Sequence, residues 1–244
     1  MMLVLSGEGP SDLGQCQHAN GMCSGTDFMP GPLTVMLDQL LEVFLGYRPV
    51  ELDRGCVCFV PKAELLRRQN ERKQGRRVSL VGKKRDQETG HFFHNAWTLG
   101  CIALEQESAR NDRGIAVLHR DSDPTTSSKS AEWASKFKSM HDGFLRAGYD
   151  RGVAMLPKPI SEAWLLCASR NGAVNCAALE EESGNPSAAN PLKNQLAEAL
   201  GEEKSAAGLS EWLNSVVFDK DRALSMPSFA RFYEPLQDAI TKAM

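Results

Sequence analysis

The sequence predicts an α/β protein with a mostly parallel sheet flanked by helices. Short apolar runs, which indicate buried strands, alternate with longer segments of helical periodicity. The predicted strands are residues 3–5, 57–60, 115–118 and 152–156. Because a strand–helix–strand repeat favours a right-handed parallel crossover, this alternation predicts a parallel sheet. The chain has 244 residues and 42% hydrophobic content, enough to bury a full core, so we expect residues 1–244 to form a single domain.

The other elements follow in chain order. Apolar residues at helical spacing predict an amphipathic helix over residues 33–45. Further helices are predicted over 62–74, 92–107, 133–147 and 160–166, with a strand or hairpin arm over 78–81. Beyond a Gly-, Ala-, Ser- and Asn-rich loop, short helices are predicted over 191–200, 209–217 and 228–243. Their apolar positions are too few for an independent core, so we expect residues 171–244 to form a helical cover on a core of residues 2–170.

Acidic residues follow two of the predicted strands. Glu8 and Asp12 come after the first strand, and if the turn continues into a helix, both lie on one side of its first turn. Asp121 and Asp123 follow the third strand, and residues two apart in an extended segment share a face. Carboxylates gathered at a sheet edge repel one another unless a cation lies between them, and oxygen ligands suit Mg²⁺ or Mn²⁺. The alternative is that each motif is an ordinary acidic turn or helix start.

A third segment adds polar groups to the same edge. The fourth strand is followed by Pro157-Lys158-Pro159, and the next helix begins near Ser161-Glu162. Because open α/β sheets bind ligands at the carboxyl ends of their strands, Glu162 is predicted to be a fifth acid there. Lys158 is a candidate catalytic residue that stabilises charge on a transferring phosphate; the alternative is a solvated turn lysine.

The pairing of a strand-Glu-Gly-x-x-Asp motif with a later strand-Asp-x-Asp motif resembles the TOPRIM fold. The resemblance is closest to the OLD-type nucleases and related TOPRIM-like proteins of bacterial anti-phage defence loci, some of which have a Glu-Ala-Trp segment like residues 162–164. It covers roughly residues 2–170 and implies a Rossmann-like sheet. It also implies that one or two metal ions are held by Glu8, Asp12, Asp121 and Asp123, and that Glu8 acts as a general acid or base. About a hundred residues separate the motifs, so we expect an insertion over residues 14–112.

The resemblance also implies a function. A chain of this kind would be a metal-dependent endonuclease that hydrolyses DNA or RNA as the effector of a phage-defence system. OLD-type nucleases carry or recruit an ATPase, and this sequence has no Gly-x-x-x-x-Gly-Lys-Ser/Thr motif. A separate ABC- or AAA-type ATPase subunit is therefore the expected partner. The alternative is a non-catalytic TOPRIM-like subunit that binds or regulates an ATPase-containing complex.

The predicted helix over 62–74 and the residues after it carry a dense basic block. Its members are Arg67, Arg68, Arg72, Lys73, Arg76 and Arg77. Such a block near a metal site could hold a phosphodiester backbone without reading its sequence. The alternative is a solvated helix face balanced by nearby glutamates. The net charge of −3 provides no global attraction, so nucleic-acid binding would depend on this local block.

The remaining chemistry-bearing residues give weaker signals. The seven cysteines lack zinc-site spacing and are odd in number, so we expect buried free thiols in a reducing compartment. His119 is a possible general base, although Glu8 is the preferred candidate. His91 and His94 are expected to be satisfied imidazoles on a half-buried helix. The opening apolar run is too short for a signal peptide or membrane span, so we expect a cytoplasmic protein without membrane contact.

Overall fold

The computed structural model of the chain describes residues 1–9, 12–18, 21–75, 89–122, 130–169 and 175–244, apart from the side chains of residues 73–75, 130 and 131. Its centre is a four-stranded sheet in which every neighbouring pair is parallel. The strands are β1 (Met2–Ser6), β4 (Val57–Phe59), β5 (Gly114–His119) and β6 (Gly152–Met155), in the spatial order β4-β1-β5-β6. In the register, Leu3 is paired with Val57 on one side and with Ile115 on the other. The predicted α/β class and parallel sheet are confirmed.

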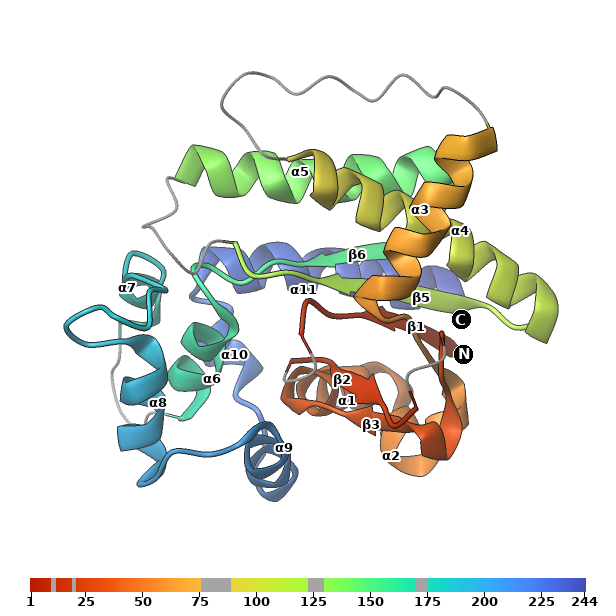
Figure 1. The fold of residues 1–244 in the computed structure, drawn as a ribbon. Coiled ribbons are helices and arrows are strands. Elements are labelled where there is room, and N and C mark those ends of the chain that lie inside the picture. Colours follow the sequence, from red (N-terminus) through yellow and green to blue (C-terminus); the bar gives the residue numbers. More distant parts are fainter. Residues whose placement is uncertain (10–11, 19–20, 76–88, 123–129, 170–174) are drawn as a thin grey trace.

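Helices cover both faces of this sheet (Figure 1). One core contains residues of α1 (Pro32–Leu45), α6 (Ser161–Ser169) and α11 (Pro227–Ala243), and the other contains residues of α3 (Lys62–Gly75), α4 (Gly90–Arg110) and α5 (Ser130–Ala147). Successive strand residues point to opposite faces, so Leu3 and Leu5 belong to the first core and Val4 to the second. Burial on both sides explains why the strands read as nearly continuous apolar runs.

The predicted helices and main-sheet strands are observed within three residues of their expected ends. The predicted strand or hairpin arm over 78–81 lies outside the described residues. Much of the expected insertion consists of regular elements. It supplies β4, the edge strand beside β1, and it contains α1, α3 and α4.

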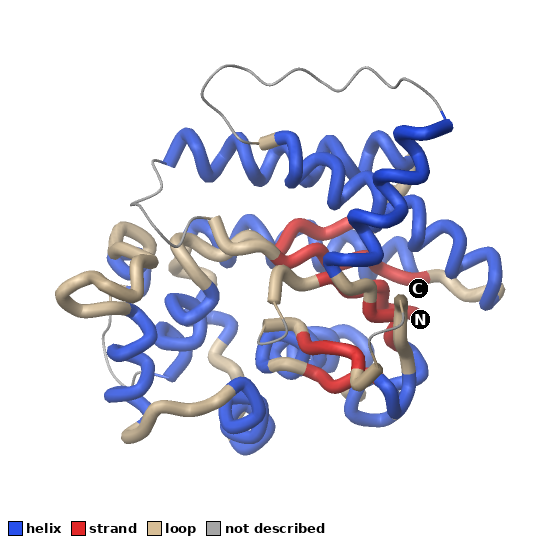
Figure 2. The backbone as a smooth tube through the Cα atoms, in the orientation of Figure 1, coloured by secondary structure: helices blue, strands red, loops and turns tan. Residues whose placement is uncertain are grey.

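The helical spacing considered for Glu8 and Asp12 does not occur in the described residues. Asp12 and Leu13 form a turn that leads into β2 (Gly14–Cys16), which pairs antiparallel with β3 (Phe28–Pro30) in a small second sheet (Figure 2). Three further short segments lie in this part of the chain: η1 (Gly25–Asp27), α2 (Pro49–Leu52) and η2 (Arg54–Cys56). Any convergence of Glu8 and Asp12 must therefore come from the turn and its neighbours rather than from helical periodicity.

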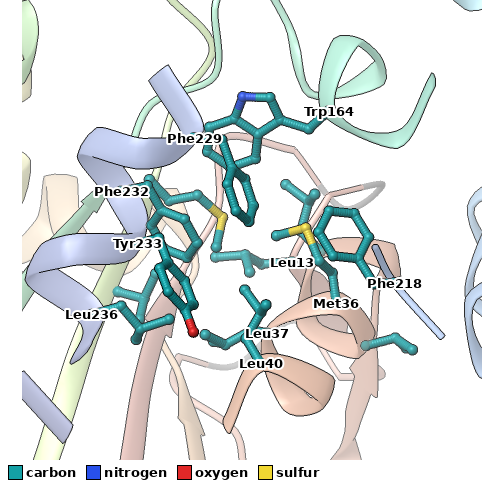
Figure 3. Packing of buried hydrophobic residues seen from close by; sticks show 14 of the residues in the cluster. Leu13, Met36, Leu37, Leu40, Trp164, Phe218, Phe229, Phe232, Tyr233 and Leu236 are labelled. Atoms are coloured by element: carbon teal, nitrogen blue, oxygen red, sulfur yellow. The ribbon is translucent and has the colours of Figure 1, made fainter. Parts of the chain in front are cut away.

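The C-terminal helices contribute to the core that also contains α1 and α6. They are α7 (Cys176–Leu179), α8 (Leu192–Leu200), α9 (Ala206–Ser215), α10 (Lys220–Ala223) and α11. Trp164 of α6 is fully buried, and its indole Nε1 donates to Ser228 Oγ of α11 at 2.8 Å. Its ring also packs against Phe229 and Phe232 (Figure 3). The Trp of the Glu-Ala-Trp segment thus joins α6 to α11 and fixes the helix that carries Glu162.

The cysteines differ from the expectation of free thiols. Cys16 is bonded to Cys23 and Cys167 to Cys176, with Cα–Cα separations of 5.7 and 5.3 Å. Folding brings each pair within the range that a disulfide spans. Neither the spacing of the cysteines in the sequence nor their odd number indicates which of them become neighbours in space. Cys56, Cys58 and Cys101 carry no disulfide.

No described helix combines the length and the apolar character needed to cross a lipid bilayer.

Candidate active site at the carboxyl edge of the sheet

The carboxyl ends of β1 and β5 form the topological switch point of the sheet. From β1 the chain leads to α1 in one core, whereas from β5 it leads to α5 in the other. Adjacent parallel strands whose connections leave toward opposite faces create a crevice between their ends, and open α/β sheets bind ligands there. Glu8 follows β1 and Asp121 follows β5, so both predicted motifs border this crevice.

The start of α1 holds Asp12 in place through its backbone. The Asp12 carbonyl oxygen accepts from Leu33 N at 3.0 Å, and the next carbonyl, that of Leu13, accepts from Gly31 N at 3.0 Å and from Thr34 Oγ1 at 2.5 Å. A Cβ on Gly31 would lie 2.3 Å from the Asp12 carbonyl oxygen, so the approach requires glycine. The peptide that carries Asp12 is therefore clamped against the helix.

His119 lies between the two acidic motifs. Its Nδ1 is 3.7 Å from Asp12 Oδ2, and its Nε2 is 3.5 Å from Asp121 Oδ1. The imidazole is fully buried, and neither ring nitrogen has a hydrogen-bond partner among the described residues. Burial by itself lowers the pKa of His119, but Asp121 and Asp12 outweigh it, so the pKa lies above its usual value. The structure thus brings Asp12 and Asp121 to opposite sides of one ring.

Backbone contacts connect Asp121 with the segment after β6. Ser161 N, at the start of α6, donates to Asp121 Oδ1 at 3.2 Å. The next residue, Ser122, donates from its backbone N at 3.2 Å and its Oγ at 3.0 Å to the Pro159 carbonyl oxygen. The buried Lys136 of α5 donates from Nζ to the Ser122 carbonyl oxygen at 2.5 Å. Hydrogen bonds from α5, from the start of α6 and to the Pro159 carbonyl oxygen thereby hold Asp121 and Ser122 in place.

Glu162 joins the same group of charges. Burial raises the pKa of Glu162 above its usual value, and the negative charges of Asp121 and Asp12 raise it further. Asp12 behaves similarly, because burial raises its pKa against the attraction of His119, and Asp121 and Glu8 add repulsion. The negative charges of Glu8, Asp12, Asp121 and Glu162 are therefore close enough to repel one another. Asp123 lies outside the described residues.

Two cations at this edge are absent from the sequence-based prediction. Lys62 opens α3, and its Nζ lies 3.6 Å from Glu8 Oε1. Arg120 is 1% exposed and faces the charges of Glu8 and Asp12, while burial lowers its pKa to about 10. Its Nη1 donates to the His119 carbonyl oxygen at 2.5 Å, whereas Nε and Nη2 have no hydrogen-bond partner in the part of the chain that the structure describes. Their positions directly after strand ends are the signal that could have indicated them.

The carboxylate side chains at this edge are chemically suited to a divalent cation. Burial raises the pKa values of Asp12 and Glu162, and repulsion from the neighbouring carboxylates adds to the rise. A positive charge would stabilise such carboxylates, and their oxygens suit Mg²⁺ or Mn²⁺. Within the described part of the chain, however, no three His, Cys, Asp or Glu side chains are placed to hold one ion together. Binding would therefore need side-chain adjustment or a ligand outside that part, such as the predicted Asp123.

Lys158 is engaged with another acid. Its Nζ donates to Glu181 Oε1 at 2.6 Å, and the lysine is 5% exposed. A phosphate could bind Lys158 only by displacing Glu181 from this ion pair.

The described part of the basic block is also ion-paired. Arg67 contacts Glu64 through Nη2 at 2.6 Å and also pairs with Glu71. Arg68 contacts the same Glu64 at 3.0 Å and Glu105 of α4 at 2.9 Å. The next arginine, Arg72, lies over the Trp97 ring at 4.3 Å. The side chain of Lys73 and all of Arg76 and Arg77 lie outside the described residues. The nucleic-acid role of this block therefore stays a prediction.

A cavity of about 920 Å³ lies between α1 and residues 214–221, apart from these acids. Its polar side chains are used internally, since Gln39 Nε2 donates to the Leu213 carbonyl oxygen at 2.5 Å and Arg48 Nη2 to Asn214 Oδ1 at 2.7 Å. None of the predicted site residues lines it.

No protein family, curated protein or solved structure matches this chain in sequence or fold comparison.

Proposed function

We propose that this protein is a Mg²⁺- or Mn²⁺-dependent nuclease that hydrolyses phosphodiester bonds of DNA or RNA. The observation that carries the proposal is the placement of Asp12 and Asp121 on either side of His119 at the crevice between β1 and β5, with Glu162 close enough for the charges of both aspartates to raise its pKa. Isolated acidic turns do not bring carboxylates from three separate segments into mutual repulsion. Such repulsion is a feature of sites whose working state includes a cation.

The cation would be held by Asp12, Asp121 and Glu162, with Glu8 and Asp123 as further predicted ligands. When bound, a divalent metal offsets the carboxylate charge and withdraws electrons from the phosphodiester, which makes phosphorus easier to attack. The ligand set consists of hard oxygen donors, as expected for Mg²⁺ or Mn²⁺.

The chain's own residues supply the proton transfer and the positioning. Glu8 is 44% exposed at its side chain, so water and substrate can reach it. We assign it as general base: a water oxygen attacks phosphorus, the water proton passes to the Glu8 carboxylate, and the bond from phosphorus to the leaving sugar oxygen breaks. Lys62 lies beside Glu8 and can bind the phosphate, while the buried Arg120 balances the local negative charge.

A nucleic-acid strand at this edge would have α3 beside it. That helix begins at Lys62 next to Glu8 and continues into the basic block. Because phosphate contacts need positive charge and no particular base, this arrangement supports sequence-independent binding of a backbone. Part of the block is neutralised by Glu64 and Glu105, so substrate would displace existing ion pairs there.

The resemblance to TOPRIM-like proteins of defence loci extends the proposal. It supports a TOPRIM-like fold, a role as the effector of a bacterial phage-defence system, a cytoplasmic location, and dependence on a separate ABC- or AAA-type ATPase subunit. These points rest on the short motifs around Glu8, Asp121 and Glu162. The second candidate, a non-catalytic binding or regulatory subunit, is favoured by one observation: the described side chains do not assemble a three-ligand metal site.

Cleavage assays separate the two candidates. The protein, alone and with a candidate ATPase, is incubated with single-stranded and duplex DNA and RNA in Mg²⁺, Mn²⁺ or EDTA. We expect metal-dependent cleavage that falls at least about a hundredfold in Glu8→Gln and Asp121→Asn, because removing a general base or a ligand charge costs this much. Asp142→Asn, an exposed carboxylate on α5 paired with Lys138, is the matched control and should cleave normally.

Circular dichroism and the melting temperature verify that each variant is folded. Cleavage by Glu8→Gln and Asp121→Asn at the parental rate, or no cleavage by any form, would favour the binding-subunit function.

A further inference from the structure

A pocket of about 280 Å³ opens directly beside Glu8. It lies where the carboxyl ends of β1 and β4 meet β2, away from the side of β1 on which Asp121 lies. Its lining includes Glu8 and Lys62, the apolar Phe59 and Pro61, and Gln15 and His18 on and after β2. This pocket is not part of the predicted acidic site, although the two share Glu8.

We propose that this pocket is a subsite for one unpaired nucleotide adjacent to the bond that is cut. The inference rests on the proposed nuclease function for its place in a reaction, while the pocket itself rests on geometry. It names the substrate class: single-stranded or locally unpaired nucleic acid rather than continuous duplex.

The size of the pocket is the first argument. Pockets for drug-sized ligands measure roughly 300–1,000 Å³, so about 280 Å³ suits a single small ring system with its attached sugar. A base pair, which is twice as wide as one base, does not fit. A nucleotide can enter only when its base is free of its partner, and unpairing costs least in single strands.

The distribution of chemistry along the wall is the second argument. Pro61 and the 4% of Phe59 that is exposed give the pocket an apolar wall that suits the face of a base, and Phe59 is fixed by stacking on Phe28 with ring centroids 5.3 Å apart. The Lys62 ammonium is 52% exposed at the Glu8 end, where it can bind a phosphate. Apolar and cationic groups in this order match a base followed by its phosphate.

The rim is the third argument. His18 is 77% exposed at its side chain, and its Nδ1 pairs with Asp27, which restrains the imidazole at the mouth of the pocket. The loop that carries it is closed by the Cys16–Cys23 disulfide and tied to β4, because Cys23 N donates to the Phe59 carbonyl oxygen at 3.1 Å and Phe59 N donates back at 2.8 Å. An exposed imidazole held by Asp27 provides a second surface for stacking on a base.

Metal-free binding measurements test the pocket independently of cleavage. Thymidine monophosphate, thymidine and inorganic phosphate are titrated into the protein in EDTA, with calorimetry or NMR shifts as the readout. We expect the monophosphate to bind at least tenfold more tightly than either thymidine or phosphate alone. Single-stranded oligonucleotide should displace it, and blunt duplex of the same length should not.

Two variants and a matched control locate the site. Gln15→Trp places a large ring on an exposed residue of the pocket lining and should abolish monophosphate binding. Lys62→Gln should weaken the monophosphate at least fivefold and leave thymidine unchanged. Lys138→Gln removes a comparable exposed lysine from a Lys–Asp pair on α5 and should bind as the parent does.

Each result has a distinct meaning. No detectable monophosphate binding, unchanged binding by Gln15→Trp, or equal competition by duplex would overturn the subsite. Monophosphate binding with the expected variant pattern supports the subsite even if no cleavage is found, in which case the nuclease function alone fails. Cleavage without this binding supports the nuclease function and removes the subsite.

Discussion

The Asp12 carbonyl oxygen lies 2.3 Å from the position that a Cβ on Gly31 would occupy. Gly31 has an ordinary extended backbone, with φ −91° and ψ 176°, so contact rather than conformation requires glycine here. The contact joins the start of α1 to the turn between the two acidic residues of the first motif. It makes the placement of Asp12 depend on a residue that carries no functional group.

The first prediction follows from this contact. Gly31→Ala should lower the free energy of unfolding by about 1–3 kcal/mol, because the backbone must move to relieve the overlap. The same movement should displace Asp12 and reduce metal-dependent cleavage at least tenfold. Denaturant unfolding and cleavage rates measure the two effects. Gly90→Ala is the control, because no described atom lies within 4 Å of its added Cβ and its φ is not positive. Equal stability and activity in the two variants would contradict the clamp.

The second prediction concerns pH and the repulsion at Asp12. Because burial raises the pKa of Asp12 in the folded protein, the unfolded state binds fewer protons between the ordinary and the raised values. Stability attributable to this group therefore falls as pH rises through that window. Asp12→Asn should raise the melting temperature by a few degrees at pH 7.5 and have no such effect near pH 3, where both states are protonated.

Metal addition provides a second readout for the same variant. Mg²⁺ or Mn²⁺ should raise the melting temperature of the parent protein, since a ligand that binds only the folded state stabilises it. The increase should be smaller in Asp12→Asn and unchanged in the exposed control Asp142→Asn. A variant that is less stable than the parent at pH 7.5 would show that Asp12 is not under repulsion.

The third prediction addresses the basic block. Replacing Arg72, Lys73, Arg76 and Arg77 with alanine should weaken binding to all nucleic-acid sequences alike. It should also reduce the salt slope by about 0.7–0.9 for each phosphate that the protein no longer neutralises. Arg67→Ala with Arg68→Ala should have less effect, because Glu64 already pairs with both arginines. Fluorescence anisotropy between low and moderate salt measures the slopes. Identical slopes for the parent and the fourfold variant would restore the interpretation as a solvated helix face.

The fourth prediction concerns the disulfides. Alkylation of the denatured protein without reductant should modify only Cys56, Cys58 and Cys101, because the other four cysteines are paired. Prior reduction should expose all seven. Intact-mass spectrometry counts the added groups. Seven modified cysteines without reductant would support the free thiols predicted from the sequence.

The sequence by itself determined the sheet, its parallel direction and the strand ends that carry Glu8, Asp121 and Glu162. Apolar runs buried on both faces and helices of regular period are local properties, so they can be read along the chain. The grouping of acids at one edge followed from the same reading, because parallel strands place their carboxyl ends together. In the structure, Asp12 lies 3.7 Å and Asp121 3.5 Å from the His119 ring nitrogens.

Tertiary structure decided how those residues are held and balanced. The start of α1 donates hydrogen bonds to the Asp12 and Leu13 carbonyl oxygens just before β2, a contact between segments that local periodicity does not encode. The burial of Arg120 and the pairing of Cys16 with Cys23 likewise depend on which segments pack together. Long-range contacts of this kind arise only when the whole chain has folded, and they place Asp12 and Asp121 on either side of His119.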